Sequence, residues 1–204
     1  MSFMTRILLV RHGQSVWNAE GRWQGQADIE LSELGRSQAQ AAAKSLGSFD
    51  VIAASTLSRA AETAFIISTA LGIGPVIPVP ALIERSAGEW SGLNREEIEE
   101  QYPGYLAAEE RPPGYEDDDA LWKRVEVGLA EVVDMLGPDD EALVVAHGGI
   151  IYMLEERAGG SRGRISNLGA LWLNFDESGS LTLGERVELI NEASLTSAQA
   201  SDIL

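Results

Sequence analysis

The sequence predicts an α/β fold: a three-layer α/β/α sandwich with a mostly parallel central sheet. Three short apolar segments, residues 6–10, 50–54 and 141–146, alternate with segments of helical pattern. This alternation is typical of a parallel sheet that is covered by helices on both faces. A chain of 204 residues with 45% hydrophobic residues is long enough for one domain with a substantial core. We therefore expect a single domain over 1–204.

The first strand and the first helix are separated by an irregular segment. Residues 6–10 form a continuous apolar run, which predicts a buried strand. Residues 19–31 contain two turn-forming glycines and no helical pattern. Ser32 then has the character of an N-cap, and the Ala- and Gln-rich segment after it ends at Gly47. These features predict one helix between Ser32 and Gly47.

A second strand and helix follow at once. Residues 50–54 are a short apolar strand, and "STLSRAAETAFIISTALG" after them predicts a helix that ends at Gly72. The next segment, 73–80, carries three prolines and is expected to be an extended connector or an edge strand. "LIERSAGEWSGL" is rich in glycine and serine, so we expect a loop.

The third quarter of the chain is strongly acidic. Residues 94–110 predict a helix that is broken at Pro103, because the residue before a proline disfavours helical backbone. Residues 111–120 are expected to be a loop whose acidic end leads into the next helix. That helix, 120–137, is amphipathic and should lie on the sheet.

The last quarter supplies the third strand and a hairpin. Residues 141–146 are an apolar strand, and a short helix is expected after His147. Residues 170–190 alternate around a turn-forming centre and predict a hairpin. Residues 191–204 are small and polar, so we expect a loosely ordered tail and place the core at about 5–190.

Charge and composition limit the classes of partner. A net charge of −17 argues against nucleic acid and anionic membranes, which both favour basic proteins. The chain has no cysteine, and its apolar runs fall short of the roughly 18 residues that span a bilayer. A cytoplasmic protein is the expectation from this composition. With only two lysines, Lys44 and Lys123, a site for an anionic ligand must depend on arginine.

The two histidines occupy equivalent positions in the pattern. His12 lies in "ILLVRHG" and His147 lies in "ALVVAHGG", so each histidine follows an apolar strand and precedes glycine. Ligands of open α/β sheets bind at the carboxyl ends of the strands, where both histidines should lie. Gly13, Gly148 and Gly149 would allow backbone to approach a ligand closely, as a phosphate cradle requires.

Two arginines point to an anionic ligand at the same edge. Arg59 falls in the first turn of a predicted helix, where the helix dipole disfavours a cation unless an anion lies beside it. Arg11 directly precedes His12, and both guanidinium groups can donate forked hydrogen bonds to phosphoryl oxygens. Between two guanidinium groups an imidazole is held neutral, which preserves a lone pair for attack on phosphorus.

Four motifs in order resemble one known family. "LLVRHG", "SxxxRAxETA", "E…GxWxG" and "VAHGG" are similar to those of the histidine phosphatase superfamily, also called the phosphoglycerate mutase-like family. The resemblance runs from about Ile7 to about Ile150. "RHG" alone is a weak signal because three residues recur by chance, whereas four ordered motifs are specific.

The resemblance implies a phosphoryl-transfer site. His12 would be the nucleophile, and Glu84 the proton donor to the leaving group. The equatorial oxygens of the phosphoryl group would be held by Arg11, Arg59 and His147. The phosphate or the substrate would be bordered by Asn18, Gln24, Gly25 and Gly148. Such a site needs positioning and charge stabilisation, so neither a metal nor a cofactor is expected.

Some assignments stay open at this point. Glu89 lies five residues after Glu84 in the same predicted loop, and the family pattern favours Glu84 as the acid. Three tryptophans, Trp17, Trp23 and Trp90, fall in predicted loops near the site, where their rings could wall the substrate pocket.

A phosphatase is the main functional hypothesis, with a small phosphorylated metabolite such as a sugar phosphate or a phosphoglycerate-type ester as substrate. The mutases carry a long basic insertion after the acid, whereas the corresponding segment here is short and acidic. The alternatives are a phosphoglycerate mutase, a protein phosphohistidine or phosphopeptide phosphatase, and a non-catalytic phosphate-binding module. A homodimer is an open option.

Overall fold

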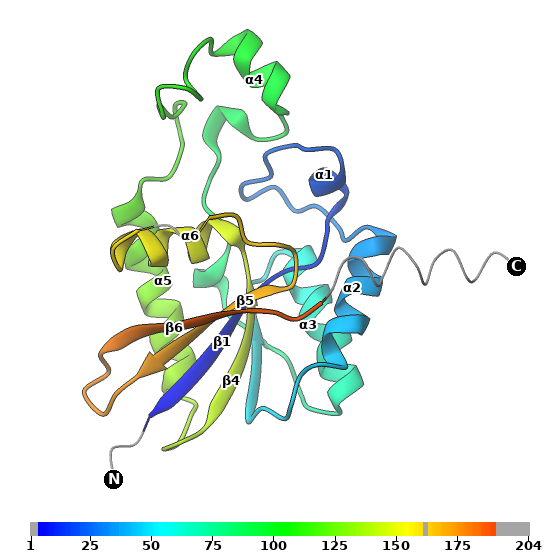
Figure 1. Ribbon diagram of the computed structural model, residues 1–204, viewed down its shortest axis with the longest axis vertical. Coiled ribbons are helices and arrows are strands. Elements are labelled where there is room, and N and C mark those ends of the chain that lie inside the picture. Colours follow the sequence, from blue (N-terminus) through cyan, green and yellow to red (C-terminus); the bar gives the residue numbers. More distant parts are fainter. Residues whose placement is uncertain (1–3, 161–162, 191–204) are drawn as a thin grey trace, which may run out of the picture.

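The computed structural model describes residues 4–160 and 163–190, and it confirms the predicted α/β/α sandwich (Figure 1). One sheet contains six strands in the described residues. The strands are β1 (Thr5–Arg11), β2 (Val51–Ala54), β3 (Ile77–Pro78), β4 (Glu141–Ala146), β5 (Gly169–Phe175) and β6 (Leu181–Glu188). The helices are α1 (Val16–Ala19), α2 (Glu33–Ala43), α3 (Ser58–Leu71), α4 (Arg95–Gln101), α5 (Asp118–Val133) and α6 (Gly148–Arg157), with 3₁₀ turns η1 (Pro80–Leu82) and η2 (Gly88–Trp90).

The sheet is parallel except at one edge. Its strand order is β3-β2-β4-β1-β5-β6, and the first four of these strands run parallel. The predicted hairpin forms β5 and β6, which pair antiparallel to each other and add β5 antiparallel to β1. The proline-rich segment supplies the short edge strand β3, where a missing N–H does not break the sheet.

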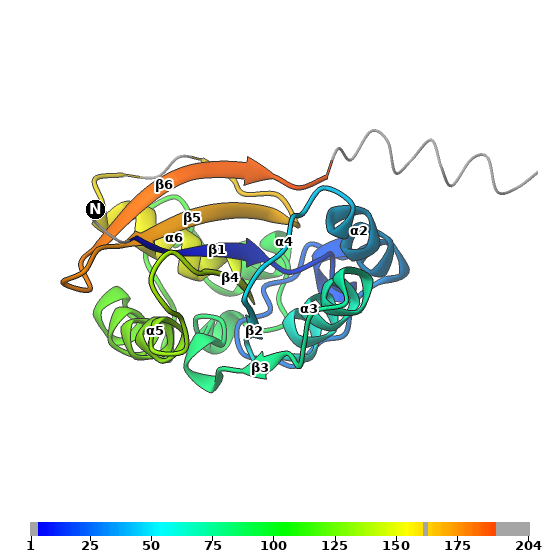
Figure 2. The same cartoon turned by 90° about the horizontal axis from the view of Figure 1, so that it is seen from below.

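The central strands are apolar throughout because both of their faces are buried. In β1, Ile7 and Leu9 pack with α5 and α6, whereas Leu8 and Val10 pack with α2 and α3. This follows from the alternation of side chains across a strand. Figure 2 shows the two pairs of helices on opposite sides of the sheet.

The helices begin and end near the expected capping residues, and two of their ends differ from the prediction. Ser32 caps α2 by accepting from the Gly35 N–H at 3.0 Å, but α2 ends at Ala43, before the expected stop. α3 ends as predicted at Gly72, whose φ of 69° is left-handed. α5 begins earlier than predicted because Asp117 caps it, accepting from the Ala120 N–H at 2.8 Å.

Residues 84–117, here called the cap, extend beyond the carboxyl ends of the strands (Figure 1). The predicted helix over 94–110 is confirmed only as far as Gln101, because Pro103 follows. A small aromatic cluster holds the cap together. It contains Ala87, Trp90 and Ile98, with Trp23, Leu93, Tyr102, Tyr105, Leu106 and Tyr115 against them.

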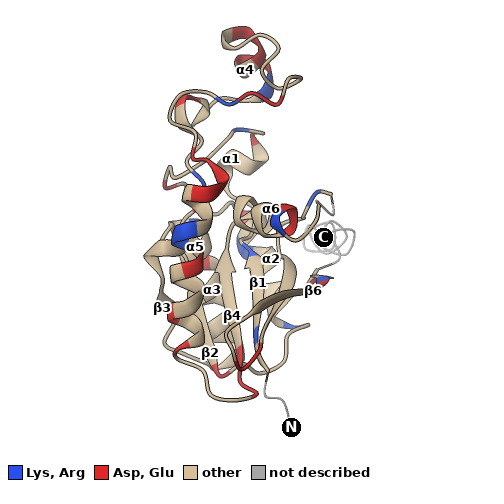
Figure 3. Ribbon diagram, turned by 90° about the vertical axis from the view of Figure 1, so that its left-hand side faces the viewer, with Lys and Arg blue, Asp and Glu red and all other residues tan. Residues whose placement is uncertain are grey.

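The tail that was predicted over 191–204 lies outside the described residues. Among the helices of the described residues, none combines the length and apolar character of a membrane span. Figure 3 shows acidic residues along the ribbon of α4, of α5 and of the loops at the amino ends of the strands. Any positive charge at the carboxyl ends of the strands is therefore a local patch within an acidic molecule.

Candidate active site

The sheet brings both histidines to one edge. β1 and β4 are parallel neighbours, and Arg11 is in register with Ala146, so the residues that follow them emerge together. The His12 N–H donates to the Ala146 carbonyl oxygen at 3.1 Å. The ring centroids of His12 and His147 lie 5.2 Å apart in an edge arrangement. The topology thus produces the pairing of imidazoles that the sequence predicted.

His12 is held in one tautomer. Its Nδ1 lies 2.6 Å from the Gly13 carbonyl oxygen, an acceptor, so Nδ1 carries the proton and Nε2 keeps its lone pair. The backbone beside the ring is tightly packed, because a Cβ on Gly13 would lie 2.6 Å from the Gly35 oxygen. Burial lowers the pKa of His12 well below its ordinary value, and Arg59 and Arg11 add to that effect. The ring is therefore neutral at pH 7, as a nucleophile requires.

His147 lies fully buried behind His12. Its Nε2 is 2.7 Å from the Ser55 hydroxyl oxygen, which already accepts the Leu57 N–H at 3.3 Å. The hydroxyl is thus disposed to donate to Nε2, which leaves the proton of the ring on Nδ1. Within the described residues Nδ1 is buried and has no hydrogen-bond partner. Burial, followed by the charge of Arg59, lowers the pKa of His147 well below its usual range.

Arg59 is completely buried and is held by a loop. Its Nη1 donates to the Ala27 carbonyl oxygen at 2.7 Å, and its Nη2 donates to that of Gly25 at 2.8 Å. In the described part of the chain its Nε has no partner. Burial lowers the pKa of Arg59 to about 10, so the group is still a cation at pH 7. A buried cation with unused donors is suited to bind an anion.

Arg11 and the start of α6 complete the anion site. Nη1 of Arg11 donates to the Ile165 carbonyl oxygen at 2.6 Å, which fixes the guanidinium beside the cavity. His147 is the N-cap of α6 and makes no side-chain capping bond, and the Gly149 N–H in the first turn donates to Glu84 instead. A Cβ on Gly148 would lie 3.5 Å from Arg11 Nε. The helix N-terminus and Arg11 therefore favour negative charge at the same point.

Glu84 rather than Glu89 reaches the site. The two carboxylate oxygens of Glu84 accept the N–H groups of Arg85 at 2.7 Å and of Gly149 at 3.0 Å. Glu89 instead accepts the Tyr102 hydroxyl and does not line the cavity. The geometry places a carboxyl group beside the N-terminus of α6, where it can serve as a proton donor.

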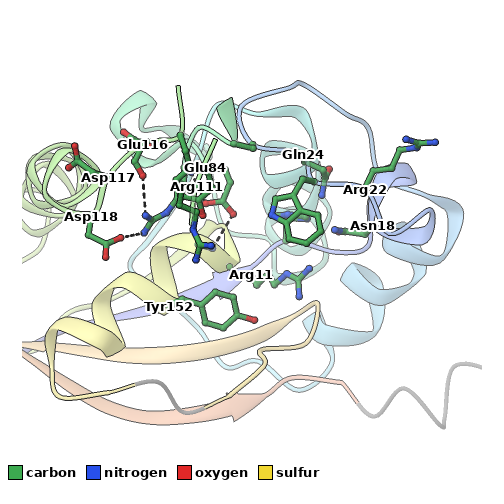
Figure 4. A pocket seen from close by; sticks show the side chains of 18 of the residues that line it. Arg11, Asn18, Arg22, Gln24, Glu84, Arg111, Glu116, Asp117, Asp118 and Tyr152 are labelled. Atoms are coloured by element: carbon green, nitrogen blue, oxygen red, sulfur yellow. Dashed lines mark hydrogen bonds and ion pairs between the residues drawn. The ribbon is translucent and has the colours of Figure 1, made fainter. Parts of the chain in front are cut away.

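A cavity of about 670 Å³ opens at this edge of the sheet (Figure 4). Eight of the nine predicted site residues line it, and His147 is the one that lies behind its wall. Those eight are Arg11, His12, Asn18, Gln24, Gly25, Arg59, Glu84 and Gly148. Segments from β1, α3, the cap and α6 thus meet around one space.

Asn18 and Gln24 are fixed by neighbouring polar groups. The Ser15 hydroxyl donates to Gln24 Oε1 at 2.7 Å. Asn167 Nδ2 donates to the His12 carbonyl oxygen at 2.9 Å and to Asn18 Oδ1 at 3.4 Å. Asn167 precedes β5 in a segment without a motif, so its contact with the His12 backbone could not be predicted from the sequence.

The tryptophan prediction is wrong for two of the three residues. Trp23 lines the cavity, but Trp90 is buried in the aromatic cluster of the cap, with its ring 5.8 Å from that of Trp23. Trp17 belongs to the short helix α1 and does not line the cavity. The cap needs a core of its own, and aromatic rings supply it.

The cavity also contains residues that sequence reasoning missed. Its outer part is lined by groups from the cap, the loop before it and α6. They include Arg22, Arg85, Arg111, Tyr115, Tyr152 and Glu156. The expectation that such a site depends on arginine is met, since five arginines and no lysine line the cavity. In the residues that the structure describes, no group of three or more histidine, aspartate or glutamate side chains has a geometry that could hold a metal ion.

Residues 7–178 match the model of the histidine phosphatase superfamily, branch 1. The chain belongs to this superfamily. It is 36% identical over 160 residues to the metal-independent phosphoserine phosphatase of Arabidopsis thaliana, covering 74% of this chain and 67% of that one. It is 37% identical over 171 residues to the glucosyl-3-phosphoglycerate phosphatase of Mycobacterium tuberculosis, with 73% of each chain covered.

Solved structures of histidine phosphatases have the same fold. A mycobacterial glucosyl-3-phosphoglycerate phosphatase in complex with VO₃ aligns with a TM-score of 0.78 and 33% identity, over 88% of this chain and 96% of that one. A phosphoserine phosphatase mutant from Entamoeba histolytica, in complex with phosphoserine, aligns with a TM-score of 0.71 and 26% identity, covering 91% and 98%.

Proposed function

We propose that this chain is a phosphomonoester phosphatase that hydrolyses a small phosphorylated metabolite without a metal or a cofactor, through a phosphohistidine on His12. One observation carries the proposal. A buried imidazole with its proton on Nδ1 presents Nε2 to a cavity that is also lined by Arg11, Arg59 and Glu84. The family supports the same reading, because its relatives include phosphatases of small metabolites.

In the first step, Nε2 of His12 attacks phosphorus and the P–O bond to the leaving group breaks. Arg11 and Arg59 stabilise the charge on the transferring phosphoryl oxygens. Nδ1–H of His147 has no other partner in the described residues, so we assign it as the third donor. Glu84, acting as a carboxylic acid, gives its proton to the leaving oxygen, so an alcohol departs rather than an alkoxide.

In the second step, water hydrolyses the phosphohistidine. Glu84, now a carboxylate, accepts a proton from the attacking water, and the P–N bond breaks. Inorganic phosphate leaves, and His12 returns to its neutral form with the proton still on Nδ1. The Gly13 carbonyl keeps that tautomer throughout, because the ring cannot turn without losing the hydrogen bond.

Arg111 supports a substrate with a second anionic group. It lines the cavity, and none of the ion pairs in the described part of the chain involves it. Its guanidinium stacks over the Trp90 and Tyr115 rings at 5.9 and 5.3 Å and donates to the Glu110 carbonyl oxygen. A phosphoglycerate-type ester carries a carboxylate that could take this position. The volume of the cavity leaves room for such a group beyond the phosphate.

A mutase is the second candidate. The chain is 36% identical over 159 residues to a 2,3-bisphosphoglycerate-dependent phosphoglycerate mutase of Gloeobacter violaceus. The cap disfavours this activity, since it is short and acidic and would give water access to a phosphoenzyme. A protein phosphohistidine or phosphopeptide phosphatase has no observation in its favour here. A homodimer and a cytoplasmic location stay predictions from the sequence.

The test is a hydrolysis screen without added metal. Purified protein is incubated with p-nitrophenyl phosphate, sugar phosphates and 3-phosphoglycerate, and the release of phosphate is measured alongside the formation of 2-phosphoglycerate. We expect phosphate release that is abolished by His12→Ala, and trapped phosphohistidine in the wild type. Release that is absent from every ester, or unchanged by His12→Ala, would refute the proposal.

A further inference from the structure

Arg124, on α5, binds the backbone of the candidate acid and of the residues just before it. Its Nη1 donates to the carbonyl oxygens of Ala81 at 2.9 Å and Ile83 at 2.6 Å. Its Nη2 donates to the carbonyl oxygen of Glu84 itself at 2.9 Å. One guanidinium therefore fixes the segment that turns out of η1 into the cap, at the point where Glu84 projects.

Glu116 holds the guanidinium from the other side. Its two carboxylate oxygens each accept from Arg124 at 2.7 Å, through Nε and Nη2. The side chains are only 21% and 15% exposed, so solvent screens the pair weakly. Burial alone would raise the pKa of Glu116, but the hydrogen bonds and charge of Arg124 outweigh it and lower that pKa.

The same carboxylate reaches the segment just after the acid. Glu116 Oε2 accepts the Ser86 N–H at 3.1 Å, and the Ser86 carbonyl oxygen accepts the Glu116 N–H at 3.1 Å. Arg85 Nη1 donates to the Glu116 carbonyl oxygen at 3.1 Å. Residues 83–86 are thus tied on one side by Arg124 and on the other by Glu116.

The carboxyl group of Glu84 depends on this placement. One of its oxygens is held by the N–H of Gly149 on α6, a different element from the cap. That hydrogen bond forms only when residues 83–86 lie at a fixed distance from α6. Arg124 does not line the cavity and binds the backbone of Glu84 itself, so its effect on the protonation of the leaving group passes through Glu84.

We propose that Arg124, paired with Glu116, is a positioning residue for general-acid catalysis, which holds Glu84 where it can protonate the leaving oxygen. The inference rests on the proposed function. It predicts that loss of Arg124 impairs the protonation of the leaving group and spares the attack by His12. A displacement of about 1 Å at a reacting group can cost about 10²-fold in rate.

The choice of ester separates the protonation of the leaving group from the attack by His12. p-Nitrophenolate leaves without help from an acid, whereas an alkoxide needs a proton, so only alkyl esters depend strongly on Glu84 in the first step. The substrates are p-nitrophenyl phosphate and the alkyl ester that the wild type hydrolyses fastest in the screen. Arg124→Lys keeps the charge but loses the fork, and Arg124→Gln with Glu116→Gln removes both charges so that none is left unpaired.

The matched control is Arg36→Gln. Arg36 also makes a two-point pair with a carboxylate, Glu62, between the elements α2 and α3, and neither residue lines the cavity. Thermal unfolding of every variant checks that the fold is kept. The steady-state constants of each variant are then measured on both esters, in the wild-type background and in Glu84→Gln.

For Arg124→Lys we expect kcat/KM, which reports only the steps up to phosphoryl transfer, to fall at least about 10-fold on the alkyl ester and to change less than about 3-fold on p-nitrophenyl phosphate. In the Glu84→Gln background, Arg124→Lys should have no further effect on the alkyl ester. Arg36→Gln should leave the ratio of the two rates unchanged.

Equal losses of kcat/KM on both esters, or a full additional loss in the Glu84→Gln background, would overturn the inference. Arg124 would then have a structural role only. A wild type that hydrolyses neither ester is a separate outcome that refutes the proposed function, and the positioning role with it.

Discussion

Stability should fall between pH 7.0 and pH 5.5 because of the two buried histidines. Burial and the nearby arginines lower the pKa of both His12 and His147 well below the ordinary value. In the unfolded chain each imidazole titrates near pH 6.5. Above that pH neither state binds a proton, and the full stability is present. Below it the unfolded state gains protons that the folded state excludes, so the free energy of unfolding decreases.

The expected size follows from linkage. With both rings unprotonated in the folded chain, each histidine removes about 1.3 kcal/mol between pH 7.0 and pH 5.5, or about 2.5 kcal/mol for the pair. Carboxylates contribute little in this window. The hydrogen bonds that lower the pKa of Glu97 and Glu116 lose their effect only as the pH falls below about 4.5.

The assay is urea unfolding at the two pH values in a buffer free of phosphate, since a bound anion would stabilise the folded state. His12→Asn and His147→Gln, which replace a titrating ring by a neutral amide, should each reduce the decrease by about half. A decrease that is the same in both variants as in the wild type would refute the reasoning. The two imidazoles would then titrate in the folded chain as they do in the unfolded chain, and burial would not be what keeps His12 neutral.

Two further predictions concern contacts inside the site. Gly149→Ala would place a Cβ 2.3 Å from Glu84 Oε1, so kcat on an alkyl ester should fall at least about 10-fold. Gly47→Ala, whose Cβ meets open space, should leave kcat unchanged. Equal rates for the two variants would contradict the placement of the acid. Ser55→Ala removes the hydroxyl that orients His147, so kcat should fall about 10-fold with KM little changed, and Ser55→Thr should restore part of it if the ring is held by that oxygen.

The sequence was informative wherever a residue follows a regular element. His12 and His147 come directly after apolar strands, and the carboxyl ends of parallel strands share one edge, so their meeting needed no knowledge of distances. Arg59 was predictable for a similar reason, because a cation in the first turn of a helix conflicts with the helix dipole.

The cap was not predictable in the same way. Its residues have no strand or long helix to fix their direction, and the aromatic cluster that orders them is assembled from 20–31 and 84–117. Trp90 was therefore predicted to line the substrate pocket, although its ring is buried. Arg111 and Arg124 could not be assigned from the sequence, since neither spacing nor periodicity relates them to Glu84 or to the cavity.

The phosphate end of the site was predictable and the cap was not, and the physical reason for this difference bears on specificity. The phosphate end of the site is built from the ends of strands and helices, whose positions follow from backbone hydrogen bonds. The substrate end is built from side chains of the cap, which are placed by ring packing and by Arg124 with Glu116. Changes in the cap can alter the shape and charge of the outer cavity while the phosphoryl-transfer groups stay in place. Substitutions at Arg111 should therefore change the choice of ester far more than the rate on p-nitrophenyl phosphate, which has no second anionic group to bind.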